Sequence, residues 1–247
     1  MQKDISNYSY IPILNEEECK EVRDNLYALR SYWIKRSYDT PCNFFTLGVA
    51  TYLDASESQN VNETYHQRLR LYNSILSEYF GCLLEKIRRS LQEYLNSPVT
   101  YTKSFALPGF HIFLAPSLSS IPQSEPHFDR QYHFLPWSNA LDRIEPISFT
   151  LAINLPKSGG GLDSWEVSQY TLNRAYRCGL VHTIENYLKY VSRKEKIFHS
   201  YRIGYLFLHT RVFLHRISAT QNLTLEDERI TLQGHGVRIK GKWILYW

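Results

Sequence analysis

The chain has 247 residues, of which 43% are hydrophobic and 21% are charged, and its formal net charge is +4 at pH 7. This length and composition can bury a sizeable core, so we expect residues 1–247 to form a single domain. The mild positive charge comes from lysines and arginines interspersed with acids, as in KIRRSLQEYL, which argues against a nucleic-acid partner.

The sequence shows no motif for membrane insertion, secretion or cysteine pairing. No run of eighteen apolar residues occurs, and the start MQKDISNYSYIPIL lacks a basic stretch followed by an apolar one, so we expect neither a membrane span nor secretion. The four cysteines, Cys19, Cys42, Cys82 and Cys178, are scattered without a C-x-x-C pair, which argues against a disulfide framework or a zinc knuckle. Reduced thiols in a cytoplasm are expected.

The first 99 residues are expected to be mainly helical support. Asn15 followed by three glutamates predicts the start of a helix over residues 15–32. The run FFTLGVATYL predicts a strand over 44–53, and a polar loop follows over 54–63. Apolar residues spaced by three and four then predict a long helix over 64–95, which ends before Pro98.

A β core is expected over residues 100–247. Strands are predicted over 100–107 and 109–116, and residues 147–155 alternate with a period of two, so that one face packs and the other can line a pocket. The three glycines in KSGGGLD predict a tight turn, because no helix-opening Gly-Lys-Ser/Thr follows to make a phosphate-binding loop.

An excursion over about residues 164–200 interrupts this core, with helical character from 172 to 194, before strands resume over 201–209, 212–219 and 229–239. Functional residues concentrate in such excursions from a rigid scaffold. We therefore expect this insertion, with Trp165 and Tyr170, to cover the mouth of the site and shape substrate choice, the alternative being a plain packing helix.

Three side chains predict a metal site. Positions two apart on an extended strand point the same way, so His127 and Asp129 in SEPHFDRQY can hold one ion together. His215, on a later strand-like run, would complete the set. Two imidazoles and one carboxylate on one face of a metal leave coordination positions open, which is the arrangement of non-haem Fe(II) oxygenases.

An arginine follows His215 on the last predicted strand of the core. Arg229 lies fourteen residues after His215, and Thr231 shares its strand face. A guanidinium presents a planar fork of donors that matches a carboxylate bidentately. This pair predicts an anchor for a carboxylic acid beside the metal.

With these motifs, roughly residues 100–240 resemble the Fe(II)/2-oxoglutarate-dependent dioxygenase superfamily. The resemblance implies a double-stranded β-helix (jelly roll, cupin-like) with packed helices, Fe(II) on His127, Asp129 and His215, and 2-oxoglutarate on Arg229 with Thr231. It also implies that O₂ and 2-oxoglutarate are consumed while a substrate is hydroxylated. Halogenases of the superfamily replace the carboxylate ligand, prolyl-hydroxylase types use lysine at the anchor, and nucleic-acid demethylases carry a second arginine where His235 stands, so these subclasses are disfavoured.

Other residues are candidates for substrate contact. Gln131 and His133 would share the face of Asp129 if the strand continued, and His111 and Trp165 are further candidates. The expected substrate is a small molecule or peptide: an amino acid, a peptide residue or a related natural-product intermediate. Desaturation or cyclisation by the same site, and a cupin-like isomerase or binding module without oxygenase activity, remain open as alternatives.

Overall fold

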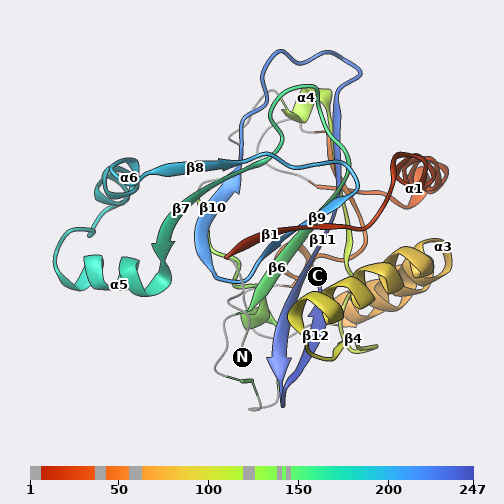
Figure 1. The fold of residues 1–247 in the computed structure, drawn as a ribbon, viewed down its shortest axis with the longest axis horizontal. Helices are drawn as coiled ribbons and strands as arrows, with labels where there is room; N and C mark the ends of the chain where they lie inside the picture. The colour runs from red at the N-terminus through yellow and green to blue at the C-terminus, as the bar shows by residue number, and fades with distance from the viewer. Residues whose placement is uncertain (1–6, 37–42, 56–62, 119–125, 138–140, 143–145) are drawn as a thin grey trace.

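Two facing β-sheets form the centre of the molecule (Figure 1). The computed structural model describes residues 7–36, 43–55, 63–118, 126–137, 141–142 and 146–247. The larger sheet runs in the order β1 (Tyr8–Pro12), β9 (Tyr205–His209), β6 (Ile147–Asn154), β11 (Glu228–Ile239), β5 (Gly109–Leu114), β3 (Phe44–Leu47) and β2 (Ile34–Lys35). β12 (Lys242–Tyr246) extends it by pairing with β11 and with β4 (Val99–Tyr101). The smaller sheet contains β10 (Phe213–Ile217), β7 (Leu162–Ser168) and β8 (Lys196–His199).

Two helices cover the outer face of the larger sheet (Figure 1). α1 (Glu16–Ala28) begins as predicted at Asn15, whose side chain accepts from Glu18 N while the Glu18 carboxylate accepts from Asn15 N. α3 (Glu63–Leu95) has a break in its helical geometry at Phe80. Apolar side chains of both helices pack on the outward residues of the strands in one continuous core, which confirms the predicted packing stripe.

The inner face of the larger sheet carries a row of polar side chains along β11, and this row belongs to the site. Along β11, Arg229, Thr231, Gln233 and His235 point inward, whereas Ile230 and Leu232 point to the helices and belong to the core. The predicted jelly roll, mainly β with packed helices, is therefore confirmed. The division into helical support over 1–99 and a β core over 100–247 is less clean than expected, because β1, β2 and β3 from the first part join the larger sheet.

Two predicted segments near residue 50 differ from expectation. The strand expected over 44–53 ends at Leu47, because Gly48 adopts a φ of +119° where a Cβ would lie 2.9 Å from the Trp247 ring, and α2 (Thr51–Asp54) follows. The side chain of Asp54, expected in a polar loop, is instead buried and accepts two hydrogen bonds from Arg36. The rest of that loop, residues 56–62, and Cys42 lie outside the described residues.

Two further strands are shorter than predicted. The strand expected over 100–107 extends only over β4, and the one expected over 109–116 ends at Leu114, where α4 (Ala115–Leu118) starts. A short 3₁₀ turn, η1 (Arg30–Tyr32), likewise replaces the last turn predicted for the first helix.

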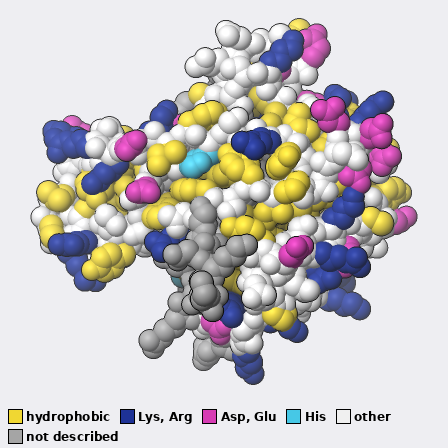
Figure 2. All heavy atoms as spheres, in the orientation of Figure 1, with side chains coloured by type: hydrophobic (Ala, Val, Ile, Leu, Met, Phe, Trp, Pro, Cys, Tyr) yellow, Lys and Arg dark blue, Asp and Glu magenta, His cyan; other side chains and the backbone are white. Residues whose placement is uncertain are grey.

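The excursion begins later than predicted and contains two helices. Residues 162–168 form β7, and the helical arm consists of α5 (Gln169–Arg177) and α6 (Ile184–Ser192). The arm projects from the side of the molecule (Figure 1), and its surface mixes apolar and basic side chains (Figure 2), including the exposed Tyr170 and Tyr176. Among the described residues, no helix has the length and hydropathy needed to cross a bilayer.

Candidate metal centre

The smaller sheet and one loop bring the three predicted ligands together. His127, Asp129 and His215 each offer one ligand atom, and these atoms all lie within 4.8 Å of one another. Because metal–nitrogen and metal–oxygen bonds are about 2.1 Å long, small side-chain adjustments allow one ion to contact all three. The sequence prediction that these residues form a group is therefore matched by the geometry.

Backbone pairing holds the loop of His127 against β10. His127 N donates to His215 O at 2.9 Å, and His215 N donates to His127 O at 3.0 Å. These two bonds place the two rings 4.7 Å apart, centroid to centroid. The distant histidine is thus fixed to the H-x-D motif by a pair of main-chain bonds.

Hydrogen bonds orient the other two ligands. The carbonyl of Phe213 lies 2.8 Å from Nδ1 of His215, so that ring nitrogen carries the proton and Nε2 faces Asp129 Oδ2 at 3.4 Å. Gln131 Nε2 donates to Asp129 Oδ1 at 3.1 Å. Burial opposes charge on both ligands, yet their mutual attraction dominates: the pKa of His215 is raised and that of Asp129 is held well below its usual range. These charges and hydrogen bonds suit the group to bind a cation between its ligand atoms.

Arg229 lies deep in the barrel and is fully buried. Its Nε donates to the carbonyl of Gly160 at 2.9 Å, and its Nη1 donates to Thr231 Oγ1 at 3.3 Å. Among the described residues, Nη2 has no hydrogen-bond partner. A buried guanidinium with an unused donor fits a carboxylate of the co-substrate that the sequence predicts.

The turn with three glycines supplies the partner of Arg229. Gly159 and Gly160 have φ of +81° and +73°, which is the left-handed region that glycine adopts without strain, so the predicted tight turn is present. A Cβ on Gly160 would also meet Pro156 at 2.9 Å. The turn therefore presents the carbonyl of Gly160 to Arg229, and the missing side chain lets the backbone at Gly160 pack against Pro156.

Sequence reasoning missed Tyr201, whose ring centroid lies 5.5 Å from the Arg229 guanidinium carbon. Burial lowers the pKa of Arg229, and Tyr201 is the first of the groups that oppose this. The 19 tyrosines of the chain give no sequence signal that would single it out. Tyr52 was also missed: its hydroxyl lies 2.7 Å from Nε2 of His111.

Of the residues predicted to contact substrate, Gln131 and His111 lie near the site, whereas His133 lies away from the metal ligands. Gln131 contacts Asp129. His111 is buried on the inner face of β5, opposite Thr231, and among the described residues its Nδ1 has no partner. The strand expected to continue past Asp129 is wrong: residues 131–134 form a 3₁₀ turn, η2 (Gln131–Phe134), so His133 does not share the face of the ligands and its side chain is exposed.

Trp165 does not cover the mouth. Within β7, Ser164 pairs with His215 and therefore shares its inner face, whereas Trp165 pairs with Leu214 on the opposite face. Trp165 is buried there against Val191 of α6. This placement corresponds to the packing alternative, because strand alternation starts at Leu162 and turns the indole away from the metal ligands. A role of Trp165 in substrate contact stays a prediction without geometric support.

The chain is similar to known proteins in its three-dimensional structure but not in its sequence. No protein-family model matches the chain, and no curated protein matches it by sequence. Among solved structures, an N-substituted L-amino acid dioxygenase from Burkholderia ambifaria, in complex with alpha-KG, aligns with 100% of this chain and 88% of its own at a TM-score of 0.56 and 14% identity. The non-heme alpha ketoglutarate dependent epimerase SnoN from nogalamycin biosynthesis aligns over 97% of this chain and 84% of its own, with a TM-score of 0.53 and 13% identity. AviO1 from Streptomyces viridochromogenes aligns over 97% and 93%, with a TM-score of 0.51 and 10% identity. At these identities the likeness establishes a common fold.

Proposed function

We propose that this protein, which has the fold of the Fe(II)/2-oxoglutarate-dependent dioxygenases, is an oxygenase of that superfamily that hydroxylates an unactivated C–H bond of a small molecule or peptide residue. The observation that carries the proposal is the pairing of the His127, Asp129 and His215 group with the buried Arg229, whose Nη2 has no partner among the described residues. A metal site alone would suit many proteins. A buried cation aimed into the same barrel needs an anion, and a dicarboxylic co-substrate provides one.

Each part of the site has a role in this proposal. His127, Asp129 and His215 would hold Fe(II), and Arg229 with Thr231 would hold the distal carboxylate of 2-oxoglutarate. When bound, these two cofactors supply the oxidation: O₂ converts 2-oxoglutarate to succinate and CO₂, and one oxygen atom enters the substrate C–H bond. Gln131 keeps the carboxylate of Asp129 oriented, and the carbonyl of Gly160 keeps the guanidinium pointing inward.

The experiment is anaerobic addition of Fe(II) and 2-oxoglutarate to the purified protein, read by the weak visible charge-transfer band of the ternary complex. We expect a band for the native protein, none for His127→Ala and a weakened one for Arg229→Ala. His182→Ala, at an exposed histidine on the arm, is the matched control and should keep the band. Iron binding without a band would instead favour the cupin-like isomerase or binding module.

The nature of the oxidation is tested separately. Desaturation or cyclisation by the same centre would give the same band and the same succinate, since these outcomes differ only in how the substrate lies. Product mass distinguishes them, because hydroxylation adds one oxygen atom whereas desaturation or cyclisation removes two hydrogen atoms. The amino acid dioxygenase and epimerase with this fold support a small-molecule substrate as the first class to screen.

A further inference from the structure

The helical arm carries most of the net charge of the chain. Residues 169–195, from the start of α5 to the turn before β8, contain five lysines and arginines but two acids, a net charge of +3 where the whole chain has +4. The five basic side chains are all exposed: Arg174, Arg177, Lys189, Arg193 and Lys194. The rest of the chain is therefore close to neutral, and the arm is a local cationic surface.

The basic side chains of the arm are not neutralised by neighbouring acids. Within the part of the chain that the structure describes, none of the five has an ion-pair partner. On α3, by contrast, Arg68, Lys86 and Arg89 each pair with an acid. Unpaired surface cations on a projecting element favour a partner of opposite charge.

One face of α5 combines this charge with aromatic rings. Tyr170, Arg174 and Arg177 are spaced by four and three residues, so they lie on the same side of the helix, and Tyr176 is exposed on the adjoining side. The exposed fractions of Tyr170 and Tyr176 are 76% and 59%. Tyrosine and arginine are enriched among the residues that contribute most to protein–protein binding. This face therefore has the composition of a docking surface for a protein.

The apolar sides of the two helices are already buried inside the protein. Leu172 of α5 and Val191 of α6 pack with Trp165 and Val167 of β7 in one cluster. A helix that lies on a membrane needs an apolar face that is free to enter the lipid. The outward side of α5 instead alternates tyrosine with asparagine and arginine, so the arm suits a protein partner better than a lipid bilayer.

The arm is held firmly because it contacts the loop that carries two of the predicted metal ligands. The hydroxyl of Tyr187 donates to the carbonyl of Pro126 at 3.2 Å, and Nη1 of Arg130 donates to Oε1 of Gln169 at 3.2 Å. The ring of Phe128, from the same loop, packs against the buried cluster beneath the arm. A protein bound to the arm would therefore be held beside this loop.

We propose that the arm binds an acidic protein, whose carboxylates meet Arg174 and Arg177 and whose apolar side chains pack on Tyr170 and Tyr176. A guanidinium can pair bidentately with a carboxylate, which gives such a contact a defined geometry. Tyrosine rings offer a large and stiff contact area at a low cost in conformational entropy. The inference stands on the charge and exposure of the arm, so it does not depend on the proposed oxidation.

The test is the fluorescence anisotropy of a labelled helical peptide of glutamate and leucine, titrated with the full chain. We expect saturable binding that weakens as the salt concentration rises, since salt screens exposed charges. The double variant Arg174→Glu/Arg177→Glu should bind about tenfold more weakly or worse, because it sets like charges against each other. Tyr170→Ser/Tyr176→Ser should bind about fivefold more weakly, because it removes the aromatic contacts.

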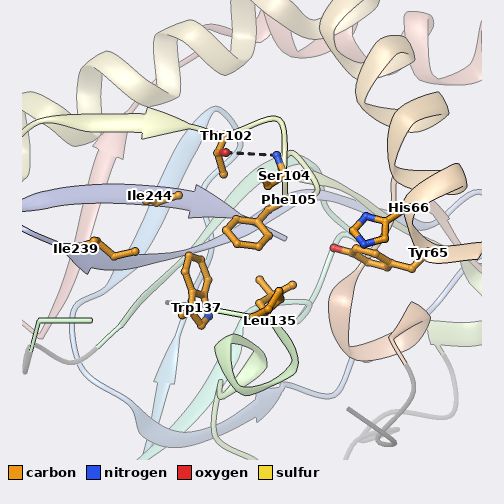
Figure 3. Close-up of a pocket in the computed structure, with 10 residues that line it drawn as sticks. Tyr65, His66, Thr102, Ser104, Phe105, Leu135, Trp137, Ile239 and Ile244 are labelled. Carbon is orange, nitrogen blue, oxygen red and sulfur yellow. Dashed lines mark hydrogen bonds between the residues drawn. The ribbon is translucent and has the colours of Figure 1, made fainter. Parts of the chain in front are cut away.

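Two matched controls separate the arm from the rest of the surface. Arg70→Glu/Lys103→Glu makes the same change in net charge at exposed positions on α3 and after β4, away from the arm (Figure 1). Ser104→Phe fills a cavity of about 330 Å³ beside the rings of Phe105 and Trp137 (Figure 3), which no lysine, arginine or acid lines and which could bind the leucines of the peptide. Both variants should bind the peptide as the native protein does.

Several results would overturn the inference. These are no saturable binding by the native protein, an equal loss in Arg70→Glu/Lys103→Glu, or unchanged binding by the tyrosine variant, since the last two would reduce the contact to general charge attraction. A loss in Ser104→Phe would place the peptide in the cavity instead. Vesicles of phosphatidylcholine and phosphatidylserine are the parallel probe: vesicle binding that the arginine variant abolishes, without peptide binding, would assign the arm to a membrane surface. Unchanged midpoints of urea denaturation show that the variants are folded.

Discussion

The substitution Arg229→Met should greatly weaken the affinity for 2-oxoglutarate while changing the free energy of unfolding only slightly. It therefore tests the role of Arg229 separately from the stability of the fold. Methionine keeps most of the length of the side chain and removes the charge. Without the arginine, 2-oxoglutarate loses its charged partner in a buried site, and removal of one member of such a pair costs about 3 to 5 kcal/mol. The affinity for 2-oxoglutarate should therefore fall by a factor of roughly 10² to 10³ or more.

The unliganded protein should respond far less. The substitution removes hydrogen bonds to the carbonyl of Gly160 and the hydroxyl of Thr231, each worth about 1 kcal/mol net. It also removes a fully buried cation with an unused donor, and burial lowers the pKa of Arg229 because the charged form is disfavoured there. These effects have opposite signs, so the free energy of unfolding should change by less than about 2 kcal/mol.

Two measurements separate these effects. Isothermal titration of 2-oxoglutarate into Mn(II)-loaded protein gives the affinity, and urea denaturation of the metal-free protein gives the stability. Arg70→Met, which removes an exposed arginine on α3, is the matched control and should leave both values near those of the native protein. An affinity within tenfold of native, or a loss of stability larger than the loss of binding energy, would refute the assignment of Arg229 as the anchor.

Three other substitutions or conditions test the surroundings of the site and the fold. Thr231→Val removes one hydroxyl partner of the anchor, worth about 1 kcal/mol, so titration calorimetry should show a roughly fivefold weaker affinity for 2-oxoglutarate; an unchanged affinity would contradict this role. Burial lowers the pKa of His209 to about 3, so the unfolded chain binds more protons below pH 6.5 and this residue alone should contribute a loss of about 1.4 kcal/mol to the metal-free protein at pH 5.5, a contribution that His209→Gln should remove in urea titrations at several pH values. Asp54→Asn breaks a buried ion pair with Arg36 and should cost about 3 to 5 kcal/mol by urea denaturation, whereas Glu85→Gln, at an exposed pair, should cost far less; similar losses for the two variants would argue against the buried pair.

The parts of the site that the sequence predicted all lie on regular strands or beside them. Arg229 and Thr231 share a face because β11 keeps a strict alternation, and their spacing could be read directly. The grouping of His127 with His215 followed from the motif, although the two backbone hydrogen bonds that join them could not be foreseen.

The sequence-based predictions failed at positions where one residue of strand register, or one turn, decides which way a side chain points. The chain after Asp129 contains no hydrophobic period that distinguishes a strand from a 3₁₀ turn, so His133 was placed on the wrong side. Trp165 shows how one residue of register decides which face a side chain takes. In β7, which starts at Leu162, the indole of Trp165 points outward, whereas a shift of one residue would have pointed it at the metal ligands. Tyr201 carries no local pattern at all, since only the folded barrel brings it to Arg229.

This division follows from how the site is built. Arg229 and Thr231 on β11 and His215 on β10 lie on strands whose periodicity can be read from the sequence. The hydrogen bond between Tyr52 of α2 and His111 of β5, by contrast, joins residues that are 59 positions apart. No short motif can record such a contact, because it exists only once the helix and the strand have packed together.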